Sequence, residues 1–369
     1  MKIGVVGCGI ISDIYQTNMK ERFADTEVVA CCAAHMESAQ KSAAKYGLKA
    51  CTYEEMLAMP EIEMIVVLTP APTHYTLIRQ ALEAGKHVYT EKSLTISLPD
   101  AKELLKLADE KNLYLGSAPD TFLGAALQTV RKAVDEGRIG QVTSFFVSAT
   151  RNLDYIAGIH KFLCMPGGGV GFDYGVYYLT ALVSILGPVK SVQALVRNLR
   201  PKRTNIAEGH PDFGKEFDSP NEDQIMAVLE FENGVVGTFS LNGDTVTPDL
   251  ADFTLYGTKG ALRLTDPNGF GGDVLMVEDP LDWVEPKVSV LSDDFLFAEN
   301  SRGIGPEEMI CAIRENRRNR ASKEMAFHVL DILCCMVESS EKRMAVEVTS
   351  TCERPAPLTK EEEEKFIRS

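Results

Sequence analysis

Residues 2–12 read KIGVVGCGIIS, and this stretch decides the fold. Lys2–Val6 is a short β-rich run, and the residues after the glycines have the pattern of a helix. Gly7 permits a tight turn, Gly9 lets a pyrophosphate approach the backbone, and the small Ser12 lets the helix pack closely on the strand. The free N–H groups at the start of a helix also attract phosphate. The stretch therefore predicts a dinucleotide-binding turn, and the residues expected against the cofactor are Gly7, Gly9, Ile10 and Ile11.

The composition excludes several classes of protein. The 369 residues are 45% hydrophobic and 25% charged, as in a globular chain rather than a disordered one. The formal net charge of −15 repels phosphate backbones and anionic membranes, so we expect no nucleic acid and no membrane as partner. The chain also lacks the pattern of a signal peptide and any apolar run near the roughly 18 residues that span a bilayer. The nine cysteines are scattered without a CxxC pair, which predicts reduced thiols, no metal site and a cytoplasmic protein.

The predicted order of strands and helices changes along the chain. Over the first 122 residues strand-like runs alternate with helix-like segments, and Met64–Leu68 is apolar at every position. This pattern predicts a doubly wound parallel sheet covered on both faces. Later strands are longer and follow one another at hairpin spacing, with Asn233-Gly234 as a turn between two of them. We therefore expect an α/β protein, with a dinucleotide-binding domain in 1–122 and an α+β domain with a large, mostly antiparallel open sheet in 123–369.

A second group of polar residues follows two predicted parallel strands. Ligands of such sheets bind off the carboxyl ends of the strands, where Thr69 and Glu91 lie. Lys92 is then expected beside the nicotinamide, although a solvated lysine is the alternative. His74 starts a helix and could simply cap it. The cofactor-binding set predicted here is Thr69, Pro70, His74, Glu91 and Lys92.

The residue that would anchor the adenosine ribose is missing. An Asp or Glu is expected at the end of the second strand, about 20 residues after the glycines. That strand ends in Ala30–Ala34 and has no acid, and no Arg stands there to meet a 2′-phosphate. The cofactor is therefore NAD or NADP, with the choice left open.

A third signal is a glycine cluster, Gly167–Gly169, that leads into an apolar helix. Asp173 and Tyr177 are four residues apart and so share a helix face. A carboxylate and a phenol on one face could bind and deprotonate a hydroxyl. The alternative is a helix-start Asp that favours the helix dipole, beside a packed Tyr.

Together these signals resemble the Gfo/Idh/MocA family of sugar and polyol oxidoreductases. The likeness covers nearly the whole chain. It runs from Gly7–Gly9 through Glu91-Lys92, Asp173, Glu232-Asn233-Gly234 and Gly257–Gly260 to a closing helix at Ala321-Ser322 and His328–Asp331. It implies an N-terminal Rossmann domain, a C-terminal domain with a large open antiparallel sheet, and NAD or NADP. It also implies a small-molecule sugar, sugar-derivative or inositol substrate. The family often associates through that sheet, so we expect a homo-oligomer, a dimer or tetramer.

The chain departs from the family pattern at three positions. Ser93 replaces the usual Pro after the Glu-Lys pair, Tyr177 replaces the usual catalytic His, and Thr180 stands at the family's next polar position. The resemblance thus places Lys92 and Asp173 at the active site but supplies no base. Tyr177 is the predicted base, because a neighbouring ammonium such as Lys92 favours a phenolate. His160 is the second choice, because histidine needs no pKa shift to act near neutral pH.

The principal hypothesis is an NAD(P)-dependent dehydrogenase that acts on a secondary alcohol of a sugar, glycoside or cyclitol. One alternative is a glycosidase of the same family that uses bound NAD transiently. Another is a non-catalytic sensing module, as in the yeast galactose repressor. The residues do not identify the sugar, the oxidised carbon or the direction of the reaction.

Overall fold

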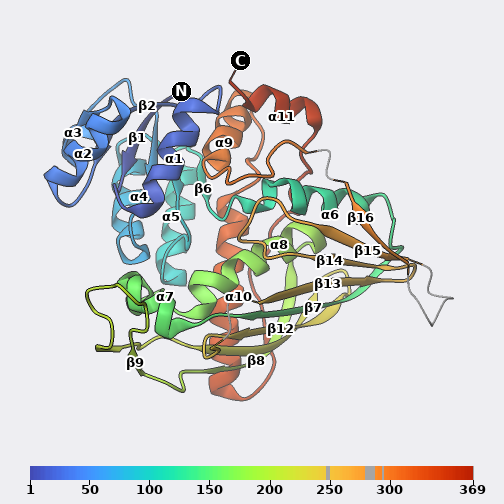
Figure 1. Cartoon of the computed structure of the whole chain (residues 1–369). Coiled ribbons are helices and arrows are strands. Elements are labelled where there is room, and N and C mark those ends of the chain that lie inside the picture. The colour runs from blue at the N-terminus through green and yellow to red at the C-terminus, as the bar shows by residue number, and fades with distance from the viewer. Residues whose placement is uncertain (247–249, 279–286, 293–294, 369) are drawn as a thin grey trace. The chain divides into compact units, whose positions relative to one another are not determined.

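The computed structural model describes residues 1–246, 250–278, 287–292 and 295–368 (Figure 1). The chain divides into two compact units. The first unit comprises residues 1–124, 295–327 and 355–369, and the second comprises 125–294 and 328–354. Two late segments therefore group with the N-terminal sheet, so the units are not two consecutive stretches of chain.

The first unit is built on a six-stranded parallel sheet in the order β3-β2-β1-β4-β5-β6. The strand order reverses between β1 and β4, and ligands bind at such a switch point in open α/β sheets. β4 is buried at every residue, as a strand covered on both faces should be. The strands are β1 (Lys2–Val6), β2 (Glu27–Cys32), β3 (Lys49–Ala50), β4 (Met64–Val67), β5 (His87–Thr90) and β6 (Leu115–Ser117).

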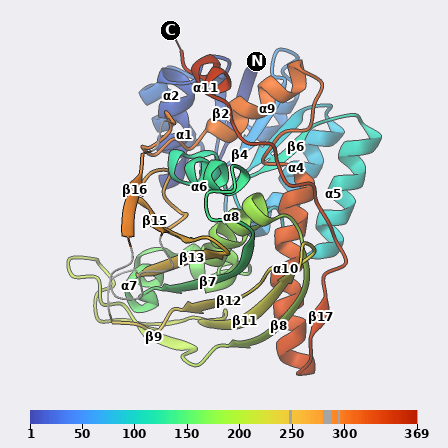
Figure 2. The same cartoon turned by 90° about the vertical axis from the view of Figure 1, so that its right-hand side faces the viewer.

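Helices connect these strands, and their starts follow ordinary capping chemistry. Thr52 and Glu55 form a capping box at the start of α3, and Ser97 caps α5. α4 and α5 pack against each other (Figure 2). The helices are α1 (Ile10–Glu21), α2 (Met36–Tyr46), α3 (Tyr53–Leu57), α4 (His74–Glu83), α5 (Leu98–Glu110), α9 (Ile304–Arg314) and α11 (Lys360–Phe366), with 3₁₀ turns η1 (Ala71–Thr73) and η2 (Thr121–Leu123).

The second unit is built on a nine-stranded sheet in the order β16-β15-β14-β13-β7-β12-β11-β8-β17. Neighbouring strands in this sheet are antiparallel, except for β12 and β7, which pair in parallel. The predicted hairpin joins β11 to β12 through Asn233 and Gly234, where Gly234 has φ of 85°. The expected fold class, a parallel Rossmann-like sheet followed by a large mixed sheet that is mostly antiparallel, is confirmed. The strands are β7 (Val142–Thr150), β8 (Val189–Arg197), β11 (Gln224–Phe231), β12 (Val236–Asn242), β13 (Ala251–Gly257), β14 (Ala261–Leu264), β15 (Val274–Glu278), β16 (Lys287–Leu291) and β17 (Val346–Glu347), beside a separate hairpin of β9 (Lys202–Thr204) and β10 (Glu216–Asp218).

One face of this sheet is covered by helix. A Cβ on Gly171 would lie 2.6 Å from Ile225 of β11, and one on Gly175 would lie 2.6 Å from Leu241 of β12. These two glycines thus let a helix lie close against the strands. The helical segments of the unit are α6 (Ala125–Asp135), α7 (Leu153–Ile159), η3 (Lys161–Cys164), the π-helical turn η4 (Gly171–Gly175) and α8 (Val176–Leu186), and α10 (Lys323–Lys342) runs from the first unit into the second.

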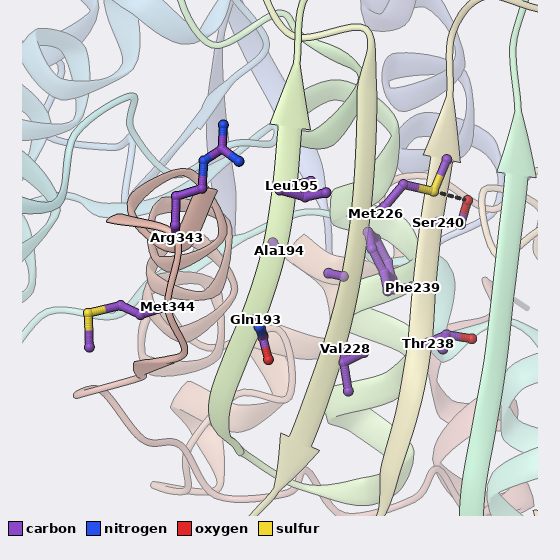
Figure 3. A pocket seen from close by; sticks show the side chains of 11 residues that line it. Gln193, Ala194, Leu195, Met226, Val228, Thr238, Phe239, Ser240, Arg343 and Met344 are labelled. Atoms are coloured by element: carbon purple, nitrogen blue, oxygen red, sulfur yellow. Dashed lines mark hydrogen bonds between the residues drawn. The ribbon is translucent and has the colours of Figure 1, made fainter. Parts of the chain in front are cut away.

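The opposite face of the sheet carries exposed apolar side chains. Along β11, residues alternate between buried and exposed, so that Met226 and Val228 are 44% and 46% exposed. Leu195 of β8 is 48% exposed on the neighbouring strand. These side chains line a groove bounded by Arg343 and Met344 after α10 (Figure 3). We call this surface the open sheet face.

Candidate active site

The turn after β1 has the geometry that its glycines predict. Gly7 has φ of 103°, and a Cβ there would lie 2.7 Å from the carbonyl oxygen of Leu68. Its N–H donates to the carbonyl of Cys32 at 2.9 Å, which ties the turn to β2. Gly9 is the N-cap residue of α1 and gives it no side-chain cap, and a Cβ on Gly9 would find no atom within 4 Å. The Ser12 hydroxyl donates to the Gly9 carbonyl at 2.6 Å. The start of α1 thus faces open space, which fits a pyrophosphate.

The other residues predicted against the cofactor follow β1 and β4 at the same edge of the sheet. Ile10 is 83% exposed at the first position of α1, and Ile11 beside it is partly exposed. Pro70 is exposed after β4, while the Thr69 and Thr73 hydroxyls lie 2.7 Å apart. An exposed isoleucine at a helix start is available for contact with a bound molecule.

Lys92 follows β5 and is held by its neighbours. Glu91 is buried, and its carboxylate accepts hydrogen bonds from the Tyr15 hydroxyl at 2.7 Å and from the Lys92 N–H at 3.1 Å. The peptide bond between Lys92 and Ser93 is cis. The Glu91 side chain therefore shapes the loop that carries Lys92.

His74 does not cap α4, because Thr73 is the N-cap residue and the imidazole faces two loops. Its Nδ1 lies 2.7 Å from the carbonyl oxygen of Ser93, and its Nε2 lies 2.8 Å from that of Thr69. The side chain has no exposed surface. His74 therefore joins the loops that follow β4 and β5.

The end of β2 contains no acidic side chain, as the sequence indicated. The nearest acid along the chain after this strand is Glu37, which is exposed and pairs with Lys41 at 2.7 Å. The turn itself contributes a polar group that we did not predict, the thiol of Cys8. A hydrogen bond from the Cys31 thiol is the main cause that lowers the pKa of Cys8 to about 7.

In the second unit the glycine cluster makes room for a carboxylate. Gly169 approaches the Glu222 side chain so closely that a Cβ would overlap the carboxylate. Glu222 accepts a hydrogen bond from the Gly171 N–H at 3.0 Å, so it caps the helical segment from outside. Burial raises the pKa of Glu222. Sequence reasoning missed this role, because Glu222 lies 51 residues from its partner.

Asp173 lies in η4 and Tyr177 at the start of α8, and both are buried. The Asp173 carboxylate forms an ion pair with Arg151, which follows β7, at 3.5 Å. The Arg151 guanidinium also stacks over the Tyr174 ring at 3.8 Å from its centroid. Arg151 is a second residue that sequence reasoning missed, since a lone arginine after a strand carries no motif.

The neighbouring tyrosines are engaged elsewhere. The Tyr174 hydroxyl donates to Asp266 at 2.7 Å and lies 3.0 Å from the Tyr178 hydroxyl. Burial raises the pKa of both phenols. His160 is the second candidate base. Its ring packs against that of Phe162, with 5.8 Å between the ring centroids.

The part of the chain that the structure describes contains one cluster of possible metal ligands, Asp25, Glu307 and Cys311. The Glu307 carboxylate accepts hydrogen bonds from the Asp25 N–H, and Asp25 pairs with Arg314. The Arg314 guanidinium thus already supplies a positive charge beside Asp25, and we assign no metal to this cluster. Within the described ranges, no helix is long and apolar enough to cross a membrane.

A Rossmann domain joined to an open mixed sheet defines a class of dinucleotide-dependent proteins, and the comparisons identify the family. Residues 1–118 match the model described as the oxidoreductase family with NAD-binding Rossmann fold, and 127–263 match the GFO/IDH/MocA C-terminal domain. The chain belongs to the Gfo/Idh/MocA family of oxidoreductases. The predicted resemblance and the nicotinamide dinucleotide cofactor are both confirmed.

Relatives include enzymes with named reactions. The chain is 24% identical to trans-1,2-dihydrobenzene-1,2-diol dehydrogenase of Bos taurus, over 72% of this chain and 75% of that one. It is 29% identical to dTDP-3,4-didehydro-2,6-dideoxy-alpha-D-glucose 3-reductase of Streptomyces violaceoruber, over 76% and 81%. Two uncharacterized oxidoreductases of Schizosaccharomyces pombe are 33% and 32% identical, but the matches span only 40% and 54% of their lengths.

Solved structures share the fold across the chain. Levoglucosan dehydrogenase in complex with NADH and L-sorbose superposes with a TM-score of 0.81 at 19% identity, covering 95% of this chain and 99% of that chain. Levoglucosan dehydrogenase in complex with NADH and levoglucosan also gives a TM-score of 0.81, at 18% identity, covering 94% of this chain and 99% of that chain.

Proposed function

We propose that this protein is an NAD(P)-dependent dehydrogenase that acts on a secondary alcohol of a sugar, glycoside or cyclitol. The observation that carries the proposal is the turn at Gly7 and Gly9, which leaves the start of α1 open at the strand edge that also bears Lys92. The named relatives support the substrate class, because their reactions concern a diol and a deoxysugar.

The cofactor supplies hydride transfer, and the chain must bind, orient and deprotonate the substrate. In the first unit, the N–H groups at the start of α1 hold the pyrophosphate, and Ile10, Ile11, Thr69 and Pro70 contact the cofactor. The Lys92 ammonium binds the reacting hydroxyl. In the second unit, Asp173 accepts hydrogen bonds from substrate hydroxyls. On oxidation, the Tyr177 oxygen would accept the proton of the substrate hydroxyl, and bound NAD(P)⁺ would accept the hydride from the carbon that bears this hydroxyl.

The contacts of the neighbouring tyrosines support Tyr177 as the base. The Tyr174 and Tyr178 hydroxyls lie 3.0 Å apart, and that of Tyr174 donates to Asp266. Burial raises the pKa of both phenols, which disfavours either of them as a base.

A panel of sugars, glycosides and cyclitols tests the reaction. We expect nicotinamide absorbance to change in proportion to substrate consumed. Release of free sugar with only catalytic NAD would instead identify a glycosidase. Cofactor and sugar binding without any turnover would identify a sensing module.

We also propose that the protein is a cytoplasmic homo-oligomer, a dimer or tetramer, that associates through the open sheet face. Met226, Val228 and Leu195 are each exposed by more than 40% on this face (Figure 3). Monomers rarely expose a contiguous apolar patch of this kind. All nine cysteines are free thiols, which fits a reducing compartment.

A further inference from the structure

His74 is a buried histidine whose ring is placed between two backbone carbonyls. Its Nδ1 lies 2.7 Å from the oxygen of Ser93 and its Nε2 lies 2.8 Å from the oxygen of Thr69. Thr69 follows β4, and Ser93 belongs to the segment after β5 that we call the Lys92 loop (residues 91–94). The ring has no exposed surface, so water cannot replace either partner.

The partners of this ring determine its protonation. A carbonyl oxygen accepts a hydrogen bond but cannot donate one. A neutral imidazole has a single N–H, so one of its nitrogens always presents a lone pair. In a neutral ring, one of the two short contacts of His74 would therefore bring a lone pair against a carbonyl oxygen. Only the imidazolium satisfies both contacts.

Two other buried or half-buried histidines show the opposite arrangement. The Nδ1 of His87 accepts a hydrogen bond from the Tyr114 N–H at 3.0 Å. The Nε2 of His328 accepts one from the Val189 N–H at 2.9 Å. A nitrogen that accepts carries no proton, so both rings are neutral. Burial lowers the pKa of His87, and it lowers that of His328 to about 4.

We propose that His74 is a buried imidazolium that clamps the carbonyl of Thr69 to that of Ser93 and thereby positions the Lys92 loop. The functional consequence rests on the proposed role of Lys92 in binding the substrate hydroxyl. His74 is a positioning residue in this scheme, because it acts on the substrate through the loop.

The groups around the ring act in both directions on its pKa, and the net effect lowers the pKa of His74 from its ordinary value. Burial is the largest cause, and the Lys92 ammonium also lowers the pKa, whereas the two carbonyls and the Glu91 carboxylate raise it. Glu91 is itself buried and accepts a hydrogen bond from the Tyr15 hydroxyl, which fixes the position of its carboxylate. Against this net lowering, the geometry favours the imidazolium, because loss of the proton would replace an attractive contact of 2.8 Å or less with a repulsive one.

Nitrogen NMR of the whole protein with labelled histidine tests the charge directly. At a pH where His87 and His328 each show one bare ring nitrogen, we expect both nitrogens of His74 to be protonated. Substitution of each of the other five histidines in turn assigns the His74 signals even if a His74 variant does not fold. A bare nitrogen on His74 would overturn the proposal.

Kinetics test the positioning role. The clamp exists below the pKa of His74 and is lost as pH rises through it, so kcat/KM should fall on the alkaline side. A His74→Gln variant can satisfy only one carbonyl, and we expect kcat/KM to fall by about 10²-fold, the cost of a misplaced loop. The alkaline limb should be absent in that variant, and His87→Gln should behave as wild type.

The two proposals fail in different ways. If Lys92→Met is fully active, the proposed function of Lys92 is wrong, while the NMR result still decides the charge of His74. If Lys92→Met is inactive but His74→Gln keeps wild-type kcat/KM and pH profile, the clamp is wrong and the role of Lys92 stands.

Discussion

At the scale of single residues, the role of Tyr177 can be separated from its packing. Tyr177→Phe keeps the ring and removes the hydroxyl, so we expect cofactor affinity to be nearly unchanged. If Tyr177 is the base, turnover should fall by about 10²–10⁴-fold, the usual size of a general-base contribution. Tyr75→Phe is the matched control, because it removes a surface hydroxyl of α4 that donates a hydrogen bond to Glu103 of α5. An active Tyr177→Phe variant with an unchanged pH profile would direct attention to His160.

A second prediction at this scale concerns the contribution of Arg151 to the stability of the fold. Arg151 forms an ion pair with Asp173, and the two side chains are only 13% and 9% exposed, respectively. Removal of one partner leaves a buried charge, so Arg151→Gln should lower the free energy of unfolding by about 3 kcal/mol. The matched control is Arg263→Gln, which breaks the exposed pair with Asp252 and should cost less than about 1 kcal/mol.

Denaturant unfolding of both variants measures the difference. Equal costs for the two substitutions would contradict the pairing of Arg151 with Asp173.

At the scale of secondary-structure elements, the sequence predicted what short-range patterns control. The turn at Gly7, the buried strand β4 and the hairpin at Gly234 each follow from steric limits on a few adjacent residues. Arg151 and Glu222 were missed because their partners lie 22 and 51 residues away along the chain. Pairing at such distances depends on the packing of whole elements, which no local pattern specifies.

The choice between NAD and NADP can be predicted from the residues at the end of β2. Ala33 stands near the position of the usual acid, so no carboxylate there can bond a 2′-hydroxyl or repel a 2′-phosphate. We expect NAD and NADP to bind with less discrimination than in a relative that carries the acid. Fluorescence titration of both cofactors measures the ratio. A preference for NAD above about a hundredfold, or about 2.7 kcal/mol, would mean that another residue supplies the anchor.

At the scale of the whole molecule, the open sheet face decides the state of assembly. Met226, Val228 and Leu195 expose apolar surface on adjacent strands β11 and β8, where a monomer would leave it in water. Light scattering at micromolar concentration should therefore give a multiple of 40.5 kDa. Val228→Lys places a charge on this face and should produce monomers without loss of fold, whereas Leu199→Lys, at an exposed position beyond the end of β8, should not. A wild-type mass near 40.5 kDa would contradict association through the sheet, and an oligomer that survives Val228→Lys would place the interface elsewhere.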